Sequence, residues 1–244
     1  MNRWHAYQAL ILLFPLPFGG DVIWAWSLYS LTCFTLLLLE LNQRFKINQN
    51  TNFPLALTKA TPIIILLLAA QLVVAVQLFF SPTPFNHATY FAIIKGLSLS
   101  LFLPLTLLML ENKNRVKRII WLIIFAATFQ AVYGALMVLS GLEWGFFVKK
   151  TIFQGVATGT FNFRNHFAGY LEISLAIGIG FLLTQGKPLI GNWRQKLRQG
   201  IETLLSPKII MRLLLAIMVI ALVLSRSRMG NTAFFASLLI TGAL

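Results

Sequence analysis

The sequence predicts an all-α, polytopic integral membrane protein with about eight transmembrane helices. Of its 244 residues, 58% are hydrophobic and only 11% are charged, whereas soluble domains are about half apolar and a quarter charged. The apolar residues also form runs of about 20, the length that a helix needs to cross the roughly 30 Å hydrocarbon layer. Composition and run length together exclude a water-soluble globular protein.

The candidate spans follow one another along the chain. The first, Trp4–Phe18, is short and interrupted by Pro15 and Pro17, so it is either a short span or a signal-like segment. Seven apolar runs follow it: Ile23–Leu41, Thr61–Phe80, Thr89–Leu110, Ile119–Leu142, Phe167–Leu183, Ile209–Leu224 and Met229–Leu244.

The basic residues predict which loops face the cytoplasm. Lys and Arg number 20 against six Asp and Glu, a formal net charge of +14. The loops Asn42–Ala60, Glu111–Arg118 and Thr184–Lys208 are basic, whereas the turns Gly19–Val22 and Ser81–Ala88 carry no Lys or Arg. The positive-inside rule places the three basic loops in the cytoplasm. In the third, apolar residues at helical spacing predict a short amphipathic helix on the inner leaflet: Trp193, Leu197, Ile201 and Leu204.

Five basic residues fall in segments that this topology turns outward: Lys149, Lys150, Arg164, Arg226 and Arg228. Short outer loops tolerate a few charges, and arginine side chains can reach lipid headgroups. A guanidinium also matches phosphate oxygens in a bidentate way, so these cations indicate a site for a diphosphate-linked lipid. On a helix, Arg226 and Arg228 would diverge by about 200°, and only one would face such a site.

Three more ionisable residues lie at or within the spans. His166 begins the span that follows Arg164 and Asn165, and it is either a satisfied interfacial residue or a group that exchanges protons with a substrate. Glu172 lies about 9 Å deeper in the same helix. Lys95 occupies a similar depth in another span, so the two side chains are candidates for an ion pair or for a substrate-binding role.

The sequence lacks the residue patterns of disulfides, metal sites and nucleotide-binding loops. Cys33 is the only cysteine, and His5, His87 and His166 are far apart, so the sequence predicts no disulfide and no metal site. It contains neither a phosphate-binding loop nor a dinucleotide fingerprint, and we expect no cofactor. Because most of the basic residues follow the membrane topology, we expect no nucleic-acid partner, only membrane lipids and an anionic substrate.

Three segments resemble the O-antigen ligase family of membrane glycosyltransferases, which includes O-antigen polymerases and protein O-oligosaccharyltransferases. Residues 159–171 read GTFNFRNHFAGYL, similar to the family's G-T-F-x-N-x-N-H-F-A-G run. Residues 224–230 read LSRSRMG, similar to its S-R-G or S-x-S-R turn, and residues 15–20 read PLPFGG, an opening common in these chains. The resemblance is sharp from about Ile119 onward, so we divide the chain into residues 1–118 and an O-antigen ligase-like region, residues 119–244.

The resemblance implies transfer of a glycan from an undecaprenyl-diphosphate carrier to an acceptor at the periplasmic face of the bacterial inner membrane. The acceptor would be lipid A-core, another glycan chain or a protein, and neither a metal nor a nucleotide sugar is needed. It implies catalytic roles for His166 and Arg228. The expected substrate-binding residues are Arg164, Asn165, Arg226, Lys95 and Glu172.

The chain departs from the family pattern in two places. Phe163 stands where the family commonly has its first asparagine, and relatives usually continue beyond the equivalent of Leu244 with more spans and a large periplasmic loop. We therefore expect a fragment of a longer enzyme or a truncated product of the family. The rival functions are a transporter, suggested by Lys95 and Glu172 within spans, and a non-catalytic remnant.

Overall fold

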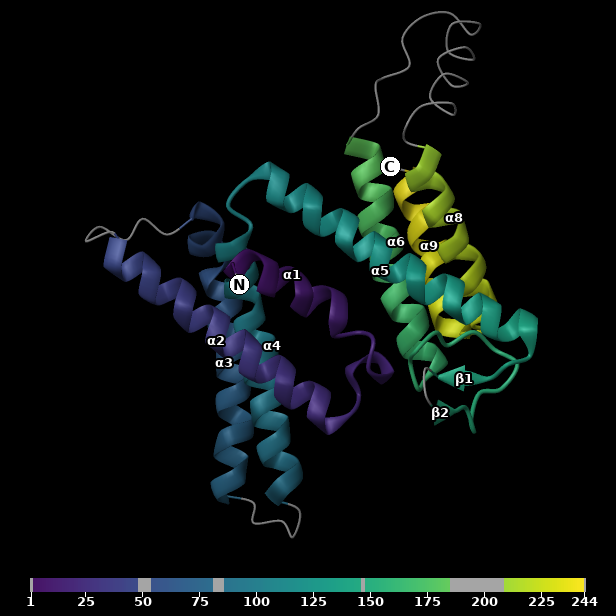
Figure 1. Ribbon diagram of the computed structural model, residues 1–244. Helices are drawn as coiled ribbons and strands as arrows, with labels where there is room; N and C mark the ends of the chain where they lie inside the picture. The colour runs from purple at the N-terminus through teal and green to yellow at the C-terminus, as the bar shows by residue number, and fades with distance from the viewer. Residues whose placement is uncertain (1, 48–53, 81–85, 146–147, 185–208, 244) are drawn as a thin grey trace, which may run out of the picture. The chain divides into compact units, whose positions relative to one another are not determined.

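The computed structural model describes residues 2–47, 54–80, 86–145, 148–184 and 209–243 (Figure 1). It divides into two compact units. The first unit comprises Met1–Phe14 and Val22–Arg118, and the second comprises Pro15–Asp21 and Ile119–Leu244. A short segment near the start of the chain, Pro15–Asp21, thus packs with residues more than a hundred positions further on, which the sequence pattern does not indicate.

Helices form most of the described residues of both units. The first unit contains α1 (Arg3–Leu13), α2 (Ile23–Ile47), α3 (Leu55–Phe80), α4 (Asn86–Met109) and the start of α5 (Lys113–Ser140). The second contains the 3-10 turn η1 (Phe18–Gly20), the rest of α5, a two-stranded antiparallel hairpin, and three further helices. These are β1 (Trp144–Gly145), β2 (Val148–Lys149), α6 (Arg164–Thr184), α8 (Ile209–Leu224) and α9 (Arg228–Ala243).

The all-α membrane fold is confirmed, and the described residues contain fewer spans than the roughly eight predicted for the whole chain. Among the described residues, α2, α3, α4, α5 and α6 are long and apolar enough to cross a bilayer. Helix α1 has 11 residues and ends at Leu13, because Pro15 and Pro17 follow and a proline inside a helix removes a hydrogen bond. Helices α8 and α9 have 16 residues each and rise about 24 Å, less than the hydrocarbon thickness.

Helix packing in the first unit is close and includes polar contacts. Helix α4 lies beside both α2 and α3 (Figure 1). A Cβ added to Gly96 of α4 would lie 1.9 Å from Oε1 of Gln71 on α3, so the Gln71 side chain packs directly against the glycine backbone. The hydroxyl of Tyr7 on α1 donates a hydrogen bond of 3.0 Å to Oγ1 of Thr106, which ties α1 to α4.

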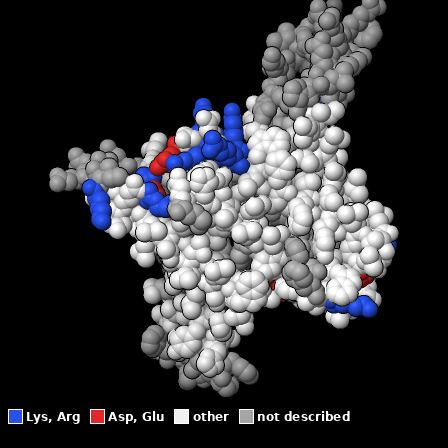
Figure 2. Space-filling model, viewed as in Figure 1, with Lys and Arg blue, Asp and Glu red and all other residues white. Residues whose placement is uncertain are grey.

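An ion-pair chain joins the helix ends at one side of the first unit. Glu40 lies at its centre, with 10% of its side chain exposed, and pairs with Arg3 at 3.0 Å and Arg44 at 2.9 Å. Glu111, of which 43% is exposed, pairs with Arg44 and Arg115, each at 2.8 Å. Figure 2 shows this mixed patch of basic and acidic atoms beside a broad surface without charged side chains.

We expect Glu40→Gln to lower the free energy of unfolding by about 3 kcal/mol, because it leaves two largely covered guanidinium groups without their shared carboxylate. Glu111→Gln is the matched control, since it also removes a carboxylate between two arginines but at an exposed site, where an ion pair contributes at most about 1 kcal/mol. Unfolding of each variant in mixed micelles measures the difference. Equal losses of unfolding free energy in the two variants would show that the burial of Glu40 does not strengthen its ion pairs.

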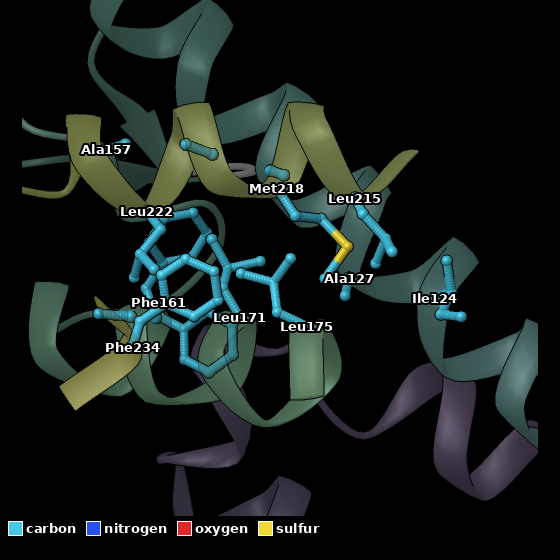
Figure 3. Close-up of a cluster of buried hydrophobic side chains, with 14 of the residues drawn as sticks. Ile124, Ala127, Ala157, Phe161, Leu171, Leu175, Leu215, Met218, Leu222 and Phe234 are labelled. Atoms are coloured by element: carbon cyan, nitrogen blue, oxygen red, sulfur yellow. The ribbon is translucent and has the colours of Figure 1, made fainter. Parts of the chain in front are cut away.

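The core of the second unit is formed by α5, α6, α8, α9 and the loop before α6. Figure 3 shows side chains from each of these elements meeting in one apolar cluster. Helices α6 and α8 come close at Gly178, where an added Cβ would lie 2.5 Å from Leu215. The cluster includes Ile124, Phe161, Leu171, Met218 and Phe234.

One predicted element falls outside the described residues. The amphipathic helix expected from Trp193, Leu197, Ile201 and Leu204 lies within residues 185–208, which the structure does not describe.

Candidate functional site

The loop before α6 is held by one buried glutamine of α5. Gln130 is fully buried; its Nε2 donates to Oγ1 of Thr160 at 2.9 Å, and its Oε1 accepts from the Thr160 backbone N–H at 2.9 Å. The Thr160 hydroxyl in turn donates to the carbonyl oxygen of Pro15 at 3.1 Å. Because a buried amide without partners costs free energy, these bonds fix the path of the loop that carries the GTFNFRNH sequence.

Gly159 allows that path. Its φ is +56°, and a Cβ there would lie 2.6 Å from Oε1 of Gln130 and 2.9 Å from the ring of Phe167. Left-handed backbone favours glycine because it has no Cβ. Position 159 therefore favours glycine for two reasons: its backbone is left-handed, and the loop approaches α5 closely there.

The second sequence motif forms a tight turn between α8 and α9. The hydroxyl of Ser225 donates to the Leu222 carbonyl oxygen at 2.6 Å, and it accepts from the backbone N–H of Ser227 at 3.2 Å. Between them, Arg226 has a φ of +51°. A non-glycine residue in this region is strained by about 1–2 kcal/mol, and the two buried serines keep it there.

The two motifs meet at α6 and α9. Oγ of Ser227 donates a hydrogen bond of 3.0 Å to Oδ1 of Asn165 and accepts one of 3.4 Å from the Gly230 backbone N–H. A Cβ at Gly230 would lie 2.7 Å from Cβ of Ala168, so the helices touch one turn further along. The backbone N–H of Ala157 also donates to the Leu224 carbonyl oxygen at 3.0 Å. The structure thus brings Asn165 and the arginine-bearing turn together.

The arginines and the histidine are accessible around this junction. The side chains of Arg226, Arg228 and His166 are exposed, and Arg164 is half-buried with its guanidinium carbon 5.4 Å from the centre of the Phe153 ring. Arg226 lies in the turn and only Arg228 belongs to α9, so the two residues do not share a helix and the divergence expected for a helix does not apply to them.

Lys150 is not available as a substrate-binding cation. Its ammonium pairs with Glu143 at 3.1 Å across the hairpin, and only 7% of its side chain is exposed. It also donates to the Val156 carbonyl oxygen at 2.7 Å. Because the carboxylate neutralises it and the backbone occupies its donors, Lys150 supports the loop and leaves Lys149 as the exposed cation of this strand.

Glu172 and Lys95 lie in different units. Glu172 is half-buried within α6 and forms no ion pair with a side chain in the described part of the chain. Lys95, on α4, is exposed and its ammonium lies 4.1 Å from the centre of the Trp26 ring. The cation–π contact gives Lys95 a partner within its own unit.

Sequence reasoning did not predict the roles of two kinds of residue at this junction. Gln130 is a solitary amide in a long apolar span, which was a usable signal because such a group needs hydrogen-bond partners. The roles of Ser225 and Ser227 depend on turn geometry, which spacing alone does not predict. Among the described residues, no group of three or more His, Cys, Asp or Glu side chains is placed to hold a metal ion.

Comparison of the chain with protein-family models, with curated proteins and with solved structures finds no match. A functional assignment therefore depends on the residues of this junction, their geometry and the motif resemblance described above.

Proposed function

We propose that the protein is a membrane glycosyltransferase that moves a glycan from an undecaprenyl-diphosphate carrier to an acceptor at the periplasmic face of a bacterial inner membrane. The observation that carries this proposal is the 3.0 Å hydrogen bond between Ser227 and Asn165. It joins the two motifs that resemble the O-antigen ligase family, and it places exposed Arg226 and Arg228 beside the helix that begins with Arg164.

The chemistry requires a cationic site for the leaving group. In the transfer, an acceptor oxygen forms a bond to the anomeric carbon while the bond from that carbon to the diphosphate oxygen breaks. The departing oxygen keeps the electron pair, so negative charge grows on the diphosphate. Preorganised cations stabilise such charge, and in this proposal Arg226 of the turn, Arg228 at the start of α9 and Arg164 at the start of α6 contact the diphosphate.

His166 and Asn165 have separate roles in this proposal. The exposed imidazole of His166 takes the proton that the acceptor hydroxyl loses. Asn165 is a positioning residue, because its Oδ1 accepts the Ser227 hydrogen bond and thereby holds the turn that carries both arginines. The acceptor in this proposal belongs to one of the three classes that the family resemblance implies: lipid A-core, another glycan chain or a protein.

We expect Arg228→Ala to lower the transfer rate about 100-fold, the usual effect of removing one group that stabilises a developing anion. The assay follows release of undecaprenyl diphosphate from a labelled lipid-linked glycan in proteoliposomes supplied with each acceptor class. Arg118→Ala is the control, since Arg118 is equally exposed but lies in the first unit. An Arg228→Ala rate equal to that of the control would contradict the assignment.

A further inference from the structure

A row of aromatic rings lies next to the arginine-bearing junction. The ring centre of Phe163 is 6.0 Å from that of Phe153 and 5.3 Å from that of His166, and both contacts are edge-to-face. The guanidinium of Arg164 lies over the Phe153 ring, 5.4 Å from its centre. We call these four side chains the aromatic platform: Phe153, Phe163, Arg164 and His166.

The platform faces away from the core. Phe153 is 36% and Phe163 is 40% exposed, whereas the neighbouring Phe161 and Phe167 are buried in the apolar cluster. Phe153 also has a φ of +55°, a conformation that costs a residue with a Cβ about 1–2 kcal/mol. Backbone strain that turns an apolar ring outward is more consistent with binding than with folding.

Exposed rings beside a cation match the chemistry of a phosphate-linked sugar. One face of a pyranose ring presents C–H groups, which pack on an aromatic ring, while its hydroxyl groups accept and donate hydrogen bonds at the rim. The first sugar of a lipid-linked glycan is joined directly to the diphosphate. If the diphosphate contacts Arg164, the sugar bonded to it lies beside the Phe153 ring that Arg164 contacts.

We propose that the aromatic platform binds the pyranose that is joined directly to the diphosphate, with Phe163 as the central stacking residue. This inference rests on the proposed function, because it takes the position of the diphosphate from it. Within the platform, Arg164 links sugar and phosphate binding, since its guanidinium contacts the Phe153 ring and carries the charge that a phosphate needs.

The competing occupant is the lipid surface itself. Aromatic residues gather at membrane interfaces, and Trp144 of the hairpin is 49% exposed in the same unit. A membrane anchor and a sugar site differ in one respect: only the sugar site distinguishes a carrier that bears a sugar from the bare carrier.

The test compares the affinity of the purified protein for two probes, a polyprenyl diphosphate and the same polyprenyl diphosphate carrying one pyranose. We expect Phe163→Ala to weaken binding of the sugar-bearing probe about 3- to 10-fold, the size of one aromatic contact, and to leave the bare probe unchanged. Phe163→Trp should retain binding of both. Trp144→Ala, the matched interfacial control, should alter neither.

Two results would overturn the platform. Phe163→Ala could weaken both probes to the same extent as Trp144→Ala, which would make the rings a membrane anchor, or it could change neither probe. Arg228→Ala separates this inference from the proposed function. If Arg228→Ala changes neither probe while Phe163→Ala acts on the sugar-bearing one, the diphosphate assignment is wrong and the platform stands. If Arg228→Ala weakens binding of both probes while Phe163→Ala changes neither, the platform assignment is wrong and the diphosphate assignment stands.

Discussion

Gly230→Leu is expected to abolish glycan transfer without unfolding the protein. A single Cβ at this position would already lie 2.7 Å from Cβ of Ala168, whereas carbon atoms in contact prefer about 3.5–4.0 Å. A leucine therefore forces α9 away from α6 by about 1 Å or more. Such a shift breaks the 3.0 Å hydrogen bond between Ser227 and Asn165 and displaces Arg228, which begins the same helix.

A compensating substitution on α6 should relieve the steric clash caused by a side chain at position 230 of α9. In the double variant Gly230→Ala, Ala168→Gly, the new methyl group occupies the space that the old one leaves, so we expect transfer to recover well above that of Gly230→Ala alone. Gly169→Ala, next to Ala168 on α6, is the control for a methyl group added without crowding, because a Cβ there meets nothing within 4 Å. Transfer in proteoliposomes measures each variant; activity in Gly230→Leu close to that of the unaltered protein would mean that helix contact does not position the turn.

Gly159→Ala is expected to lower the free energy of unfolding by about 2–5 kcal/mol, the sum of left-handed backbone strain and overpacking. Its φ is +56°, and the new methyl group would lie 2.6 Å from Oε1 of Gln130 and 3.1 Å from its carbonyl oxygen. The same atoms hold Thr160, so the loop that leads to Arg164 loses its anchor.

A second glycine, Gly155, distinguishes backbone strain from overpacking as the cause of the expected loss of stability. Its φ is +72°, but a Cβ there meets nothing within 4 Å, so Gly155→Ala carries only the backbone strain of about 1–2 kcal/mol. Unfolding in mixed micelles compares the two variants. A loss for Gly155→Ala as large as that for Gly159→Ala would show that contact with Gln130 has no part in holding the loop.

The existence of most helices was predictable because apolar runs in a membrane must satisfy their backbone hydrogen bonds internally. Their ends were not. Helix α5 begins at Lys113, six residues before the predicted start at Ile119, and α6 begins at Arg164 rather than Phe167. A charged residue ends the hydrophobic run but not the helix, since its backbone continues the same hydrogen-bond pattern into the polar layer.

The sequence proposes candidate site residues but does not predict their geometry. The resemblance identified Arg164, Asn165, His166, Arg226 and Arg228 by position in the chain. That Asn165 accepts a hydrogen bond from Ser227, 62 residues away, depends on how α6 and α9 pack. Lys150 illustrates the same limit, because its pairing with Glu143 follows from the hairpin and not from the count of outward charges.

The most direct test of the central claim is to locate the lipid-linked substrate on the protein. A photoreactive polyprenyl diphosphate carrying a pyranose is cross-linked to the protein in proteoliposomes, and the labelled residues are identified by mass spectrometry. We predict labelling within residues 153–166 and 225–230 that an excess of unlabelled carrier suppresses. Labelling confined to the ion-pair chain of the first unit around Glu40 and Arg44, or labelling that unlabelled carrier does not suppress, would contradict the proposed site.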